Sequence, residues 1–141
     1  MRLVAVFDTN VLFSSVAWKG RPFECVELAR SGTIEGATSR EIIDELMAKL
    51  QSKLAFDPRQ ALDAAADLLG FLRVVPISGS VKGVVADPDD DKVLETAVVA
   101  GATHVVTGDR RHLIPIGTFQ GVAIVSPADF LTVAATHESA E

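Results

Sequence analysis

Two aspartates follow short apolar runs that have the composition of buried β-strands. The run Leu3–Phe7 ends at Asp8, and the run His104–Val106 is followed three residues later by Asp109. Ligands of open α/β sheets bind outside the carboxyl ends of the strands, so we expect both carboxylates at one rim. Like charges brought together repel unless a cation joins them, and carboxylate oxygens suit Mg²⁺ and Mn²⁺. The predicted chemistry is therefore metal-dependent.

A third group of acids opens a predicted helix at residues 89–100. Asp87 precedes a proline and has the form of an N-cap, and Asp87 and Asp89 both suit the positive end of a helix dipole. Asp90 continues the apolar stripe formed by the residues three, four and seven positions after it, so its carboxylate should face inward. An inward carboxylate must either cap a backbone amide or join the metal cluster. The pattern favours Asp90 over Asp91 without excluding Asp91.

Three further acids lie on a predicted helix that begins near residue 38. The run Thr38-Ser39-Arg40-Glu41 has the form of a capping box, which makes Glu41 the expected partner of Thr38. Glu45 lies beside the apolar stripe of this helix. The pattern alone does not separate Glu45 from Glu41 or Asp44 as a site residue.

Side chains suited to other chemistries are few. Cys25 is the one cysteine, which excludes an intrachain disulfide and favours a small buried helix residue. His104 opens a predicted strand, His112 follows Asp109 and His137 lies near the end of the chain, so each is expected to be structural or exposed. The phosphate-binding pattern G-x-x-x-x-G-K-[ST] does not occur. Nothing in the sequence therefore indicates an activated nucleophile or a triphosphate site.

Strands and helices alternate along the whole chain. We expect strands at about 3–7, 33–37, 73–77, 104–106 and 121–125, with helices between them and a short one after 126. This order predicts an α/β sandwich around a mostly parallel sheet of about five strands. One domain is expected over residues 1–133, followed over 134–141 by a polar tail that is frayed from residue 137 onward.

The composition is that of a globular protein, with 141 residues, 48% of them hydrophobic and 23% charged. The formal charge of −6 argues against a module that coats nucleic acid through phosphate neutralisation, but it is compatible with a metal site. No stretch approaches the ~20 apolar residues that span a bilayer. The first apolar run is interrupted by Asp8 and is too short for a signal peptide. We expect a cytoplasmic protein without a membrane partner.

Four segments in this order resemble the PIN-domain family, in particular the VapC-like toxins of bacterial and archaeal toxin–antitoxin systems. They are Val6–Leu12, Ser39–Leu46, Asp87–Glu95 and Gly101–Asp109. The closing segment Val125–Leu131 is also similar. Each is weak alone, but the ordered set covers nearly the whole chain and is fairly specific.

The resemblance implies a PIN-like α/β/α sandwich and a ribonuclease that cleaves RNA phosphodiester bonds with Mg²⁺ or Mn²⁺. A small antitoxin protein and a homodimer are the partners that it implies. The family's acids fall on four residues, as catalytic groups and metal ligands, and two further positions match groups that orient them. The acids are Asp8, Glu45, Asp90 and Asp109, and the orienting residues are Asn10 and Thr107. The choice of Glu45 over Glu41 rests on this resemblance.

Five basic residues are expected near the same rim and could bind the RNA backbone. They are Lys19, Arg21, Arg40, Arg110 and Arg111. A solvated surface explains each of them equally well.

Three other functions fit less well. A phosphatase of the haloacid-dehalogenase type needs a second aspartate two residues after the first, where this chain has Asn10. A receiver domain needs an acid after a middle strand, but the third predicted strand ends at Ile77 without one. A non-catalytic PIN-like interaction or RNA-binding module would usually have lost acids that are all present here.

Overall fold

The computed structural model describes residues 2–85 and 87–140, except for the side chains of residues 139 and 140. Within these residues, six strands form one sheet in the order β3-β2-β1-β4-β6-β5. Their bounds are β1 Val4–Phe7, β2 Glu35–Thr38, β3 Leu72–Val74, β4 His104–Val106, β5 Thr118–Phe119 and β6 Val122–Val125. All neighbours are parallel except β5 and β6, which confirms the predicted α/β fold with a mostly parallel sheet.

The sixth strand, β5, was not expected. It has only two residues and pairs with β6 across a tight turn in which Gln120 has φ 49° and Gly121 has φ 82°. A two-residue loop with positive φ at both positions is the preferred connection of a β-hairpin. So short a strand leaves no periodic pattern in the sequence.

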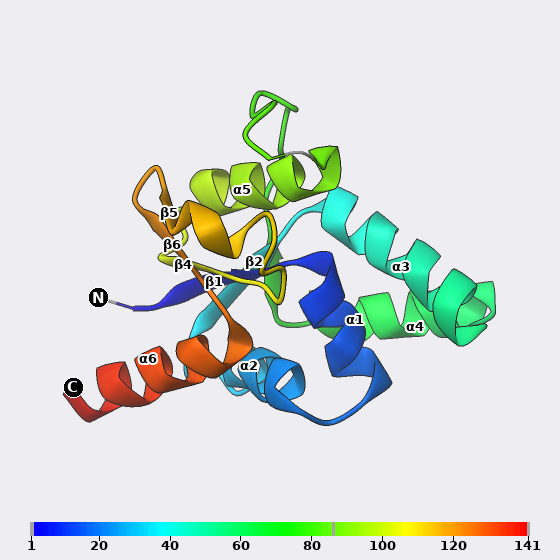
Figure 1. Cartoon of the computed structure of the whole chain (residues 1–141). Helices are drawn as coiled ribbons and strands as arrows, with labels where there is room; N and C mark the ends of the chain where they lie inside the picture. Colours follow the sequence, from blue (N-terminus) through cyan, green and yellow to red (C-terminus); the bar gives the residue numbers. More distant parts are fainter. Residues whose placement is uncertain (1, 86, 141) are drawn as a thin grey trace.

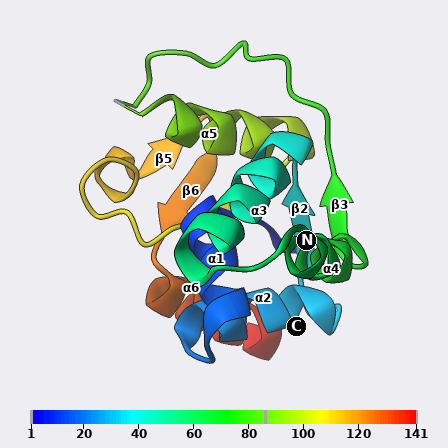
Figure 2. The same ribbon diagram turned by 90° about the vertical axis from the view of Figure 1, so that its right-hand side faces the viewer.

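In the described part of the chain, six α-helices pack around the sheet, which forms the middle of three layers (Figure 1). Their bounds are α1 Thr9–Ala17, α2 Arg21–Arg30, α3 Arg40–Leu54, α4 Pro58–Leu69, α5 Pro88–Ala100 and α6 Pro127–Ala140, with a 3₁₀ turn, η1, at Ile114–Ile116. Helix α5 covers one face of the sheet, α2 and α6 cover the other, and α1, α3 and α4 lie beyond the ends of the strands (Figure 1). Figure 2 looks toward the carboxyl ends of the strands, where the sequence places the acids.

The core lies between the central strands and their covering helices. Phe7 is 1% exposed and Val106 is fully buried, as a parallel strand covered on both faces requires. Gly36 of β2 allows α2 to approach closely, because a Cβ there would lie 2.9 Å from Ala29 Cβ and 2.5 Å from a methyl carbon of Leu72. Rigid strands of this kind hold the residues at their ends in fixed positions.

Two local expectations were wrong. Ser39, not Thr38, is the N-cap of α3, because the Ser39 hydroxyl accepts the Ile42 amide at 3.4 Å. Glu41 is therefore in the first turn of the helix and is not the expected capping-box partner of Thr38. The end of the chain, expected to fray, is helical as far as Ala140, and Ala134 is buried. Ala134 belongs to the hydrophobic core, and the helix continues from it through the polar residues that follow.

None of the helices in the described part of the chain is long and apolar enough to cross a membrane.

Candidate active site

Asp8 is fixed at the junction of β1 and α1. Its backbone N–H donates to Val106 O at 3.0 Å, which continues the pairing of β1 with β4. One carboxylate oxygen caps α1 by accepting the Val11 amide at 3.0 Å, and the other accepts the Thr107 hydroxyl. The side chain is buried, and this burial raises the pKa of Asp8 above its usual value despite the hydrogen bonds. Asp8 is thus held in one orientation at the rim.

Thr107 connects Asp8 to Asp109. Its hydroxyl oxygen also accepts the Asp109 amide at 3.0 Å, so a single side chain positions both acids. Asp109 Oδ1 accepts the amides of Arg111 and His112, each at 3.0 Å. Burial acts to raise the pKa of Asp109, but these backbone hydrogen bonds outweigh it and the net shift is downward. Asp109 is therefore ionised at neutral pH, and its second oxygen faces the His112 ring.

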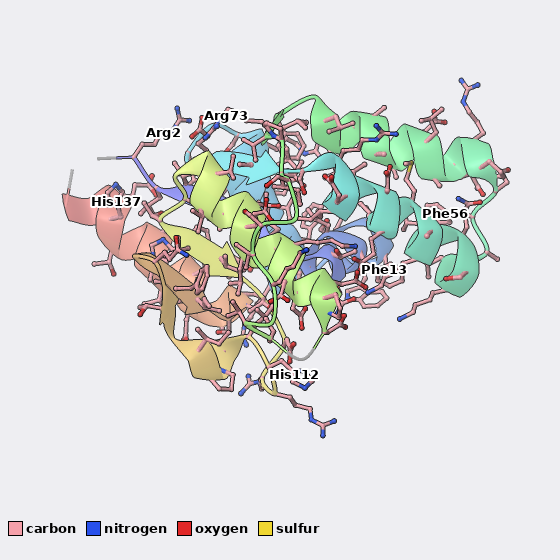
Figure 3. The ribbon with its side chains drawn as sticks, turned by 90° about the horizontal axis from the view of Figure 1, so that it is seen from above. Arg2, Phe13, Phe56, Arg73, His112 and His137 are labelled. Atoms are coloured by element: carbon pink, nitrogen blue, oxygen red, sulfur yellow. The ribbon has the colours of Figure 1, made fainter. Side chains whose placement is uncertain are left out.

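Asp90 approaches these residues from the first turn of α5. Burial, the largest cause, acts together with the charges of Asp109, Asp87 and Asp8 to raise the pKa of Asp90 to about 7. Oxygens of Asp90 and Asp109 and a ring nitrogen of His112 lie within 4.8 Å of one another. Figure 3 shows His112 beside the start of α5. Mutual repulsion of this kind favours a cation between the groups.

Asp91 points elsewhere, although it follows Asp90 directly. Its two oxygens accept the amides of Gly83 and Val85, each at 3.0 Å, and the side chain is 6% exposed. These amides belong to the loop between β3 and α5. Asp90 lines the acidic pocket described next and Asp91 does not.

Glu45 joins the acids from α3. A pocket of about 70 Å³ is lined by residues of α1, α3 and α5 together with the N-cap residues Asp8 and Asp87, namely Asp8, Thr9, Asn10, Glu45, Lys49, Asp87, Asp89, Asp90 and Val93. Glu41 and Asp44 do not line it. Lys49 Nζ lies 3.3 Å from Glu45 Oε1 and donates to Asn10 Oδ1 at 2.9 Å. The geometry therefore separates Glu45 from its two neighbours, which the sequence pattern did not do.

A larger cavity of about 230 Å³ lies between α1, α2 and α4. Its acids, Glu27 and Asp67, both pair with Arg30 at 2.7 Å. Both carboxylates are already paired with a guanidinium group, unlike the acids of the smaller pocket that face one another, so this cavity is not comparable as a cation site.

The five basic residues expected near the rim do not line the acidic pocket. Lys19 lies over the Phe23 ring, 5.8 Å from its centre, and Arg40 pairs with Asp44 at 3.6 Å. Arg21, Arg110 and Arg111 are exposed.

Three polar residues near the acids were missed or set aside in the sequence. Lys49 follows Glu45 by four residues, Lys92 follows Asp89 by three and pairs with it at 2.8 Å, and His112 follows Asp109 by three. For the two lysines, helical spacing from an acid was the available signal.

A family model described as PIN domain matches residues 4–111, a segment that contains all four acids. The chain belongs to the PIN-domain family. The resemblance inferred from the four segments is thereby confirmed at the level of this family. Among curated proteins, none matches the sequence.

Two solved structures share the fold of this PIN domain. VapBC2 from Rickettsia felis, bound to a DNA fragment from their promoter, has a TM-score of 0.63 and 16% identity, over 88% of this chain and 98% of that chain. PAE2754 from Pyrobaculum aerophilum also has a TM-score of 0.63, with 17% identity over 95% of this chain and 90% of that chain. At such identities the likeness shows the fold alone.

Proposed function

We propose that this PIN domain is a divalent-metal-dependent ribonuclease and the toxin of a toxin–antitoxin pair. The catalytic groups are Asp8, Glu45, Asp90 and Asp109. PIN domains are generally nucleases, and a nuclease of this kind requires acids gathered around a cation.

The convergence of Asp90 with Asp109 and Asp8 is the observation that carries the proposal. Three acids from separate elements face one another, and their charges help burial to raise the pKa of Asp90 to about 7. An arrangement that costs stability in the absence of a cation supports a functional explanation over a structural one. The residues fit Mg²⁺ or Mn²⁺, because carboxylate oxygens are the ligands that both ions accept.

Asp90 and Asp109 would hold the ion, with Asp8 and Glu45 binding directly or through water. A bound divalent ion lowers the pKa of water and stabilises charge on the attacked phosphate and the leaving oxygen. Thr107 keeps Asp8 and Asp109 oriented through its two hydrogen bonds. Lys49 holds Glu45 and Asn10 at the opposite side of the pocket, where Glu45 can orient a water molecule. No nucleophilic side chain is needed.

Cleavage assays on a panel of structured and single-stranded RNAs test the enzymatic part. The wild-type chain should cut RNA with Mg²⁺ or Mn²⁺ and stop when EDTA is added, and Asp8→Asn should be inactive. Glu45→Gln should lose at least about tenfold in rate, whereas Asp44→Asn, the adjacent exposed acid, should retain activity. Cleavage that survives EDTA or Asp8→Asn would show that the site is wrong. Metal binding without cleavage would favour an RNA-binding or interaction module.

The toxin part draws support from the fold shared with the VapBC2 structure. Induction of the wild-type chain should stop cell growth, and induction of Asp8→Asn should not. A short reading frame beside the gene, encoding a protein that restores growth and co-purifies with this chain, would identify the antitoxin. Light scattering of the purified chain would test the expected homodimer. Normal growth with fully active enzyme would contradict a toxin role.

A further inference from the structure

The turn after β4 places an imidazole beside the acids of the proposed metal site. His112 Nδ1 lies 3.6 Å from Asp109 Oδ2, too far for a good hydrogen bond. A cation with ligand bonds of about 2.1 Å can join two donor atoms separated by up to about 4.2 Å. We infer that His112 is a ligand of the bound metal and that it gives the site a preference for Mn²⁺ and later transition metals over Mg²⁺. This inference rests on the proposed function.

The geometry of three donors from two elements supports a shared ion. A nitrogen of His112 and oxygens of Asp90 and Asp109 lie within 4.8 Å of one another, so small side-chain rotations bring all three within bonding reach. Asp109 Oδ1 is already occupied by two backbone amides, which leaves Oδ2, the oxygen nearer His112, for the metal. Oδ2 and the imidazole therefore face one another, and Asp90 is close enough to form a side-chain hydrogen bond with Asp109.

The turn also holds the His112 backbone firmly. Ile114 N donates to Asp109 O at 3.0 Å, and the His112 amide donates to the Asp109 side chain. Leu113, the next residue, is fully buried and anchors the turn in the core. The His112 side chain itself is 44% exposed, so packing against the core does not enclose its ring. A fixed backbone with a partly exposed ring beside two acids is suited to binding an ion.

Ligand chemistry gives the expected selectivity. Mg²⁺ prefers oxygen ligands and keeps much of its water. Imidazole suits transition metals, whose affinity for nitrogen-containing sites rises from Mn²⁺ through Fe²⁺ and Co²⁺. A site with His112 should therefore bind Mn²⁺ and Co²⁺ more tightly than an all-carboxylate site does, with little gain for Mg²⁺. If His112 only formed an ion pair with Asp109, its removal would change both affinities alike.

Calorimetric titration of the metal-free chain of 141 residues with MgCl₂, MnCl₂ and CoCl₂ tests the inference. In His112→Ala the affinity for Mn²⁺ should fall about tenfold or more, as it does when a contributor to a metal site is lost, while the affinity for Mg²⁺ should change less than about twofold. The visible absorption of bound Co²⁺ should also change, because it reports a nitrogen ligand. Arg111→Ala, in the same turn and also exposed, should keep the wild-type affinities for Mg²⁺ and Mn²⁺ and the wild-type Co²⁺ spectrum. Thermal unfolding checks that each variant is folded.

The outcomes separate this inference from the proposed function. Asp109→Asn should weaken both Mg²⁺ and Mn²⁺, because it removes a carboxylate that both ions use. If Asp109→Asn does so and His112→Ala leaves the Mn²⁺/Mg²⁺ ratio and the Co²⁺ spectrum unchanged, the inference is overturned and the metal site stands. If the wild type binds neither ion more tightly than Asp109→Asn does, the proposed metal site fails and the inference fails with it.

Discussion

Asp90 and Asp91 are adjacent on α5, but their surroundings are opposite. Asp91 is buried, and each of its oxygens accepts a backbone amide of the preceding loop. Asp90 is half-buried and faces the charges of Asp109 and Asp8. A carboxylate that is fully hydrogen-bonded can stabilise a fold, whereas carboxylates that face one another need a cation. The comparison shows that identical side chains on neighbouring positions of one helix can have different functions.

Glu95 lies one helical turn after Asp91 on α5 and has the same kind of surroundings. It is 3% exposed and accepts the amides of Ser78, Gly79 and Val81 at 2.6, 3.2 and 3.2 Å. Burial acts to raise the pKa of Glu95, but these hydrogen bonds hold it below its usual value. Asp91 and Glu95 together fasten the loop between β3 and α5, which Figure 2 shows arching over the helix. One side of α5 therefore maintains structure and the other faces the site.

Replacing Asp90 and Asp91 one at a time by asparagine should give the largest difference between the two sides of α5. Asp90→Asn should lower the RNA cleavage rate by at least about a hundredfold, because it removes charge at the site, and should leave the metal-free protein at least as stable. Asp91→Asn should do the reverse, lowering the free energy of unfolding by about 2 kcal/mol through the loss of charge-assisted hydrogen bonds. Its cleavage rate per folded molecule should stay within about threefold of wild type. Urea unfolding and single-turnover cleavage measure the two effects.

Asp63→Asn, at an exposed position of α4, is a suitable control for the loss of one negative charge. If Asp91→Asn abolishes cleavage without loss of stability, Asp91 belongs to the site and the separation of the two sides is wrong.

Replacing Glu95, the second acid that binds the loop between β3 and α5, should lower the stability somewhat less than replacing Asp91. Glu95→Gln keeps the size of the side chain but loses its charge, so the free energy of unfolding should fall by about 1.5 kcal/mol. Hydrogen exchange should lose protection at the amides of Ser78, Gly79 and Val81, and not at the strands. Glu138→Gln, at an exposed position of α6, supplies the matched control. Unchanged exchange at these three amides would show that the loop is held by other contacts.

Local sequence signals predicted the parts of the site that depend on strand ends. The apolar runs before Asp8 and Asp109 were enough to predict that both acids lie at the same edge of the sheet, because the carboxyl ends of parallel strands meet there. Asp90 and Asp91 differ by about 100° around a helix, and the loop amides that bind Asp91 carry no readable pattern. Glu45 depends on how α3 packs near α5, a long-range contact, and only family resemblance selected it. His112 was set aside because its approach to Asp90 depends on the turn after β4.

The smallest effect concerns the pH dependence of stability in the metal-free protein. Asp90 has a pKa of about 7 when folded against an ordinary value of 3.8, so the folded state binds more protons between these values. Stability should therefore decrease as pH rises from about 4 to about 7. Glu95 has the opposite effect, because its pKa in the folded protein is below the ordinary value of 4.5. Its contribution to stability is therefore fully present above pH 4.5 and is lost as the pH falls through the folded pKa. Urea midpoints measured in EDTA across this range report both contributions.

The contributions of Asp90 and Glu95 should be distinguishable when stability is measured against pH for a variant of each residue. Asp90→Asn should reduce the loss of stability between about pH 4 and 7. It should not abolish that loss, because the pKa of Asp8 is also raised by burial. Glu95→Gln should leave this slope unchanged and reduce the dependence below about pH 4.5. Saturating Mn²⁺ should reverse the loss in the wild type, since a cation favours the ionised carboxylates. An Asp90→Asn profile that matches wild type would mean that Asp90 titrates normally and that the acids do not repel one another as described.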